Sequence, residues 1–363
     1  MHSRDLIEQY KSYVQDWRRY FHKHPELSNE EFETTKTLAK ELESMGVEVH
    51  VDTERGIGLI GIIHGGKPGK AIALRADIDA LPVHEHNTVD YKSETEGKMH
   101  ACGHDGHMAI LLGAAKMLMS MKDRIEGDVY LAFQPAEETG AGAPDFIKFG
   151  DWYDKIDAIF GGHVWIDLPA GLISVEEGPR MAASSQITIN VKGKQGHGAQ
   201  PHQAIDAIVV ASAIVMNLQT VVSRNVSALD SLVLTIGNIH SGSEWNVIPG
   251  EAKMGGTIRF FDPDQEEYYV ESIRRVVEHT AEAYGATATL EYVKKVPPTI
   301  NDPASSELAE RVVIDTLGKD KLSKMRKVMP GEDFAWYLQD KPGCFAFIGI
   351  QNPEIEATYD HHN

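Results

Sequence analysis

The chain has 363 residues, which exceeds the usual size of a single hydrophobic core and predicts two domains, one of which can interrupt the other. Its 54 acidic and 35 basic residues give a formal net charge of -19, which repels phosphate backbones and excludes nucleic acid as an expected partner. The first residues are polar and charged, and we expect no segment long and apolar enough to cross a bilayer. A cytoplasmic protein without membrane contacts is therefore predicted.

The first half of the chain alternates between helical and strand patterns. Apolar residues at helical spacing predict a helix that ends at Pro25 and a second helix from Ser28 or Asn29 to Gly46. The further elements expected are strands over 57–65, 71–82, 127–138 and 156–165, with helices over 104–121 and 146–153. This alternation predicts an α/β domain with a mixed, largely parallel sheet flanked by helices, in which ligands collect at the carboxyl ends of strands.

After Arg180 the pattern changes to strand, helix, strand, strand, helix, strand, the order of a ferredoxin-like α+β unit. The expected elements lie at 184–193, 202–222, 231–242, 246–261, 265–285 and 287–296. The α/β pattern resumes after 297, with helices near 304–317 and 332–338 and a strand over 344–350. We therefore expect residues 1–180 and 295–363 to form one discontinuous domain and residues 181–294 to be inserted in it.

The stretch MHACGHDGH, residues 99–107, holds one of only two cysteines in the chain. Cys102 and His104 offer a thiolate and an imidazole two residues apart, both common ligands of divalent metals. Taken alone, the cluster is better explained by a helix cap or a satisfied buried polar group than by a metal site. The other cysteine, Cys344, lies in an apolar strand pattern and is expected to be a core residue, while His100 and His107 are expected to be bystanders.

Further donors follow three other predicted strands. Glu137 and Glu138 come after the strand that begins near 127, His163 is expected at the end of another strand, and Asp77 and Asp79 at the end of a third. Each of these alone could be a surface acid, a turn residue or a lone histidine. Their joint position at strand ends of one domain favours a metal site with a carboxylate beside it that can act as a general base.

Seven motifs in order carry a specific resemblance. They are RADIDALP, MHACGHDGHMA, QPAEE, GGHVW, GKQGHGAQPHQAIDAI, NVIPGEAKMGGTIRF and PGEDFAWYL. In this order they resemble the dinuclear-metal amidohydrolase and peptidase family of aminoacylases, hippurate hydrolases and auxin-conjugate (IAA-amino acid) hydrolases. The resemblance covers essentially the whole chain, and the inserted domain stands where that family has its lid and dimerisation domain.

The resemblance implies a set of residue roles in the larger domain. The metal ligands implied are Cys102, His104, Glu138, His163 and His362, with His361 as the alternative to His362, and Glu137 is the implied general base. Asp77 and Asp79 stand where the peptidase branch has a His-x-Asp motif, so Asp79 is expected to orient a ligand. The family's segment after the last ligand is not found after YDHHN; we expect a longer natural chain or a weakly anchored ligand.

In the inserted domain, the resemblance implies that His197 reaches into the active site of a partner subunit and stabilises the oxyanion. Asn246 and Arg259 match positions that hold the carboxylate of the substrate, a role that suits the forked guanidinium of arginine. His202 is as well explained by a helix cap. A homodimer through the inserted domain is the implied assembly.

The implied activity is hydrolysis of N-acyl-L-amino acids, small molecules that would be cleaved to a carboxylic acid and a free amino acid. The implied cofactors are two divalent metal ions, zinc or manganese, with cobalt or nickel also compatible. Two alternatives stay open: a dipeptidase or carboxypeptidase that uses the same site, and a metal-dependent binding protein without turnover. Glu137 argues against the latter, because metal binding alone does not need it.

Overall fold

A computed structural model describes residues 3–355 and separates the chain into two compact units. Within the described residues, the first unit contains 3–180, Thr299–Arg326 and 332–355; the second contains Met181–Pro298 and Lys327–Gly331. The boundary expected after residue 294 falls inside a strand that continues to Val296. The short segment 327–331 joins the second unit, where Met181 forms a bridge with Val328.

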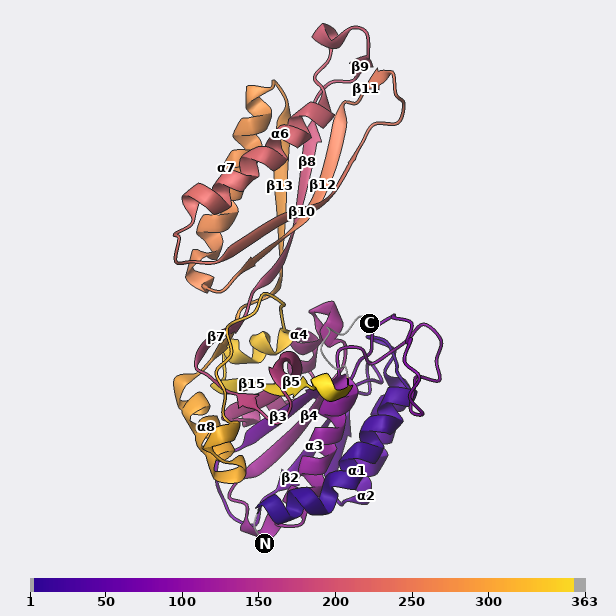
Figure 1. Ribbon diagram of the computed structural model, residues 1–363, viewed down its shortest axis with the longest axis vertical. Helices are drawn as coiled ribbons and strands as arrows, with labels where there is room; N and C mark the ends of the chain where they lie inside the picture. The colour runs from indigo at the N-terminus through magenta and orange to yellow at the C-terminus, as the bar shows by residue number, and fades with distance from the viewer. Residues whose placement is uncertain (1–2, 356–363) are drawn as a thin grey trace. The chain divides into compact units, whose positions relative to one another are not determined.

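The first unit is built on a sheet whose central strands run parallel (Figure 1). Its order is β1-β2-β4-β3-β5-β15-β6. The strands are β1 (Glu48–Val51), β2 (Leu59–His64), β3 (Ile72–Asp77), β4 (Asp128–Gln134), β5 (Ala158–Pro169), β6 (Ile173–Ser174) and β15 (Gly343–Gln351). Strands β4, β3, β5 and β15 are parallel, and the pairs β1-β2, β2-β4 and β15-β6 are antiparallel. The predicted mixed, largely parallel sheet is thereby confirmed.

Helices cover this sheet and place apolar side chains against it. They are α1 (Ser3–Lys23), α2 (Phe32–Ser44), α3 (His104–Met119), α4 (Gly142–Ile147), α5 (Trp152–Lys155) and α8 (Pro303–Leu317). The short 3-10 helices are η1 (Lys122–Arg124), η2 (Glu137–Thr139), η6 (Lys319–Lys321), η7 (Asp333–Gln339) and η8 (Pro353–Ile355), and β7 (Gly178–Met181) pairs with β14 (Thr299–Asn301). One core cluster joins Phe21 of α1, Leu38 of α2 and Leu112 of α3 to the strands. The helix expected over 332–338 is the 3-10 helix η7.

The second unit has the ferredoxin-like arrangement that the order of its elements predicts. The elements are β8 (Ser184–Lys192), α6 (Ala207–Thr220), β10 (Leu232–Ser241), β12 (Glu251–Phe260), α7 (Glu266–Ala283) and β13 (Thr287–Val296), in a sheet of order β10-β12-β8-β13. Short elements complete it: β9 (Gly196–His197), η3 (Pro201–Gln203), η4 (Val221–Asn225), β11 (Val247–Ile248) and η5 (Pro263–Gln265). Asp206 is the N-cap of α6, and its carboxylate accepts the N–H of Ile208 at 2.9 Å, a typical helix cap.

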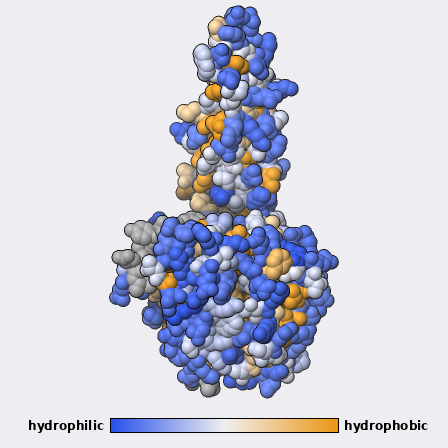
Figure 2. Space-filling model, turned by 90° about the vertical axis from the view of Figure 1, so that its right-hand side faces the viewer, coloured by the Kyte–Doolittle hydropathy of each residue, from blue (hydrophilic) through white to orange (hydrophobic). Residues whose placement is uncertain are grey.

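The expectation that no segment is long and apolar enough to cross a bilayer was wrong. The helical segment Ala207–Asn225 is long and apolar enough to cross a bilayer by length and composition, and 33% of its most apolar window is buried. The segment is apolar on two faces: one packs into the core of the second unit, and the other exposes Ile208, Val209 and Met216. Figure 2 shows apolar side chains among hydrophilic ones on the surface of this unit.

A buried histidine joins α1 to the start of α3. His22 Nδ1 lies 2.8 Å from Asp105 Oδ2, and His22 Nε2 lies 3.1 Å from Glu85 Oε1. Both carboxylates accept, so the imidazole that satisfies both is protonated. Burial lowers the pKa of His22, but Asp105 and Glu85 raise it by more, and the net pKa lies above its ordinary value. Arg18 adds a bond of 2.9 Å to Asp105.

This pairing predicts a pH-dependent contribution to stability. Because the pKa of His22 is higher in the folded than in the unfolded chain, where it is about 6.5, its contribution is complete below that value and is lost as the pH rises through the folded pKa. We expect His22→Leu to lower the free energy of unfolding by roughly 3 kcal/mol near pH 6 and by less near pH 9, measured by urea unfolding. His50→Leu, which removes an exposed pair with Glu48, is the control. An equal loss at both pH values would contradict the assignment.

Candidate metal centre

Three segments of the first unit bring the predicted donors together. Cys102 and His104 come from the start of α3, Glu137 and Glu138 from η2, and His163 from β5. Cys102 Sγ lies 3.3 Å from His163 Nε2, and His104 Nε2 lies 3.9 Å from Glu138 Oε1. Donor atoms of Cys102, His104 and His163 all lie within 4.8 Å of one another, and so do those of His104, Glu137 and Glu138. His104 therefore belongs to both groups.

His163 does not lie at the end of its strand, as the sequence suggested. Strand β5 continues to Pro169 because it keeps its parallel pairing with β15. Its pairing with β3, in contrast, ends at Phe160. After Phe160, β3 no longer pairs with this edge of β5. The donors at the start of α3 therefore have room there beside His163.

Hydrogen bonds fix which ring nitrogen of each histidine faces the site. His104 Nδ1 lies 2.9 Å from the carbonyl oxygen of Asp79, and His163 Nδ1 lies 2.6 Å from that of Val164. A carbonyl can only accept, so each Nδ1 carries the proton and each Nε2 is directed to the other donors. His104 Nε2 and Glu138 Oε1 are buried and have no hydrogen-bond partner in the described chain. Such orphaned atoms fit a bound cation, and a proton-bearing Nδ1 on a carbonyl or carboxylate is typical of ligating histidines.

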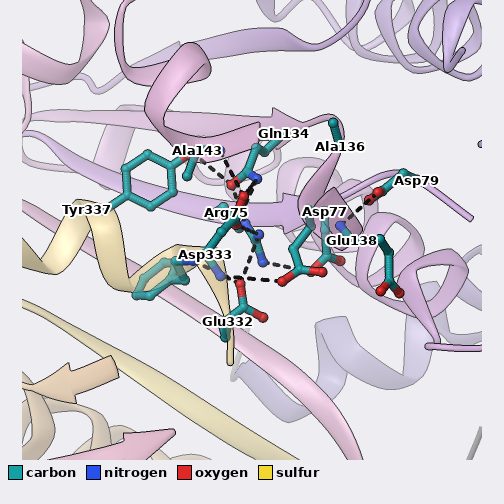
Figure 3. Close-up of polar contacts among 12 residues, drawn as sticks. Arg75, Asp77, Asp79, Gln134, Ala136, Glu138, Ala143, Glu332, Asp333 and Tyr337 are labelled. Carbon is teal, nitrogen blue, oxygen red and sulfur yellow. Dashed lines mark hydrogen bonds and ion pairs between the residues drawn. The ribbon is translucent and has the colours of Figure 1, made fainter. Parts of the chain in front are cut away.

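Asp79 holds two of the predicted ligands. Its Oδ1 lies 3.2 Å from His104 Nδ1. Its Oδ2 accepts the N–H of Glu138 at 3.0 Å, and Figure 3 shows Asp79 beside Glu138. The Ser28 hydroxyl donates to the same Oδ2 at 2.7 Å. Asp79 is thus bonded to donors from both α3 and η2, a geometry that fits the expected role of orienting a ligand.

His107 lies beside these donors, but its two nitrogens are already used. Its Nε2 accepts the N–H of Val164 at 3.0 Å, so the proton is on Nδ1, which donates to Asp77 Oδ1 at 2.6 Å. Asp77 also accepts from Arg75 at 2.7 Å. His107 therefore supports the backbone next to His163, and its bonds agree with the expectation that it is not a ligand.

A buried arginine network lies next to the donors and was missed by the sequence reasoning. The Arg75 guanidinium lies 2.7 Å from Asp77, 2.9 Å from Asp333 and 3.1 Å from Glu332. Figure 3 shows these acidic side chains gathered around Arg75. Gln134 accepts from Arg75 Nε and donates to Asp333. One signal was present: Arg75 and Asp77 are two residues apart in a strand, so they share one face. Their partners in the PGEDFAWYL motif lie too far along the chain for spacing to connect them.

The electrostatics of the site favour added positive charge. Burial lowers the pKa of His104, but Asp77 and Asp79 raise it by more, and its pKa lies well above the ordinary value. Burial raises the pKa of Glu137, and the charges of Glu332 and Asp333 raise it further. The negative field that favours a proton at His104 in the metal-free protein favours a divalent cation there for the same reason.

The predicted residues of the second unit lie in two separate places within it. His197 pairs with Val247, and the carbonyl of Asn246 accepts the N–H of Gly198 at 2.8 Å, so His197 and Asn246 are neighbours. Arg259 lies near the far end of β12, about 26 Å along the strand from Glu251. The structure therefore does not bring Asn246 and Arg259 together in one chain. His361 and His362 lie outside the described residues.

Residues 73–363 match the peptidase family M20/M25/M40. The chain belongs to this family. It is 43% identical to N-acetyl-L-cysteine deacetylase from Bacillus subtilis, over 95% of this chain and 81% of the relative, and 39% identical to thermostable carboxypeptidase 1 from Saccharolobus solfataricus, over 99% and 93%. A solved structure of a dinuclear metal-binding M20 peptidase from Bacillus subtilis superposes with a TM-score of 0.85 at 36% identity, covering 94% of this chain and 89% of that one. The resemblance drawn from the motifs is confirmed.

Proposed function

We propose that this protein hydrolyses the amide bond of N-acyl-L-amino acids at a site for two divalent metal ions. The observation that carries the proposal is that His104 Nε2 and Glu138 Oε1 are buried without a hydrogen-bond partner in the described chain, with Cys102, His163 and Glu137 around them. The proposed ligands are Cys102, His104, Glu138, His163 and His362. Zinc or manganese suits this mixture of thiolate, imidazole and carboxylate, and cobalt or nickel is compatible.

Each proposed site residue has a defined task in this mechanism. When bound, two divalent ions would lower the pKa of an attacking water and polarise the amide carbonyl. Glu137 takes a proton from that water and delivers it to the departing amine. His197 donates to the oxyanion, and Asn246 and Arg259 bind the carboxylate of the substrate.

The second candidate activity is cleavage of peptides from the carboxyl end, which the 39% identity to a thermostable carboxypeptidase favours. A matched substrate panel separates the two: N-acetyl amino acids against unblocked dipeptides with the same C-terminal residue. Faster cleavage of the dipeptides would select the peptidase. A binding protein without turnover would hydrolyse neither under any metal.

Glu137→Gln tests the assigned base. We expect kcat to fall roughly 10²- to 10⁴-fold, because glutamine cannot accept the proton, while the metal content is unchanged. Activity on an N-acetyl amino acid and metal content by mass spectrometry are measured on the same sample. Glu126→Gln, an exposed acid paired with Lys67, is the control. Retained turnover with metal bound would remove Glu137 from this role.

A homodimer through the second unit is part of the proposal. The exposed apolar residues Ile208, Val209 and Met216 of α6 offer a surface for a second copy. The separation of His197 and Asn246 from Arg259 also suits a site that takes some of these residues from each subunit. A cytoplasmic location stays a prediction.

Subunit complementation tests whether His197 acts across the dimer. His197→Ala and Glu137→Gln are each expected to be inactive, but a mixed dimer contains one complete site if His197 comes from the partner subunit. Statistical mixing of subunits should recover about a quarter of wild-type activity. Mixed dimers, isolated with two affinity tags, that show no activity would place His197 in the site of its own subunit.

A further inference from the structure

The turn that presents Glu137 and Glu138 has an unusual backbone conformation. Ala136, directly before Glu137, has φ 60° and ψ 34°, in the left-handed region that residues with a Cβ rarely adopt. In the described chain, Asn29 is the only other residue besides glycines with a positive φ. Ala136 is also buried, with 1% of its surface exposed. Contacts around this turn must therefore hold it in place.

One of these contacts comes from a residue far away in the sequence. Glu31 is completely buried, and its Oε1 accepts the N–H of Ala136 at 2.7 Å. The Ala136 carbonyl accepts from the Thr139 hydroxyl at 2.8 Å. Two residues on, Asp79 accepts the N–H of Glu138 at 3.0 Å. Glu31 and Asp79 thus hold the backbone on either side of Glu137.

Glu31 can accept from Ala136 because Glu26 bonds the first N–H groups of α2 in its place. It stands at the N-cap of α2, where a side chain usually bonds the first N–H groups of the helix, yet it makes no such bond. Glu26 does so in its place, accepting from Glu33 N–H at 3.2 Å and from Thr34 N–H at 2.7 Å. The two carboxyl groups therefore have separate roles, one on the helix and one on the turn.

We propose that Glu31 is a positioning residue that fixes the left-handed Ala136 turn and thereby directs Glu137 and Glu138 to their places beside the metal ions. This inference rests on the proposed function of those two residues. Glu31 itself is not one of the proposed metal ligands and belongs to none of the donor groups described above.

The protonation of Glu31 supplies a close control variant. Burial raises the pKa of Glu31, and the charge of Asp79 raises it further, to about 8. The group is therefore mostly a neutral carboxylic acid at pH 7, and glutamine reproduces its size, its charge and the oxygen that accepts from Ala136.

Glu31→Leu removes the acceptor at similar volume. We expect roughly 10- to 100-fold weaker metal affinity, measured by competition with a chromophoric chelator, and a lower kcat at nearly unchanged KM. Glu31→Gln should keep both values. Glu26→Leu, the matched control, should lower the melting temperature through α2 and leave metal affinity unchanged. If Glu31→Leu does not fold, Glu31→Asp, which withdraws the acceptor by one methylene, replaces it in the same comparison.

A second variant tests the turn directly. Adding Ala136→Gly to Glu31→Leu should recover part of the metal affinity, because glycine adopts a positive φ without steric cost. Wild-type affinity and kcat in Glu31→Leu, or in Glu31→Asp where it replaces that variant, would overturn the inference, and so would an equal loss of affinity in Glu26→Leu. Wild-type protein that binds no metal and cleaves no substrate would overturn the proposed function instead.

Discussion

The site depends on the ion pairs that the buried Arg75 guanidinium forms with three carboxylates. The guanidinium compensates Asp77 at the end of β3 and the Glu332 and Asp333 carboxylates that come late in the chain. Carboxylates cost several kcal/mol to bury without such compensation. Two of the acidic partners of Arg75 also contact residues at the proposed metal site. Asp77 binds His107, which supports the backbone beside His163, and the backbone N–H of Asp333 points to Glu137 at 3.4 Å.

One cation does not balance all the acids around it. In the described chain, Arg75 forms ion pairs with Asp77, Glu332 and Asp333 but not with Glu137 or Glu138, and burial raises the pKa of both glutamates. An interior with this excess of carboxyl groups is stable when protons or metal ions supply the missing positive charge. Bound cations would lower the pKa of Glu137 from its raised metal-free value and leave it as the carboxylate that accepts a proton from water.

The sequence predicted those features that depend on local residue patterns and on the order of the elements along the chain. The alternation of strands and helices gave both folds, and the motifs around Cys102, Glu138 and His163 indicated the donors that the structure brings together. Contacts across long distances in the chain were beyond it: Arg75 to Asp333, or Glu31 to Ala136. Residues that pair over such distances show no periodicity or fixed spacing in the sequence. The position of His163 within β5 was missed for a related reason, since only the pairing partners determine how far a strand continues.

The central claim is that two divalent ions are held by Cys102, His104, Glu138 and His163 together with a C-terminal histidine. Cobalt substitution tests this claim most directly. The apoprotein is titrated with Co²⁺ while its near-ultraviolet absorption and bound metal are followed. The account predicts saturation at two ions per chain, a thiolate-to-cobalt charge-transfer band in the wild type, and loss of that band in Cys102→Ser. A full complement of metal without a thiolate band, or no bound metal, would contradict it.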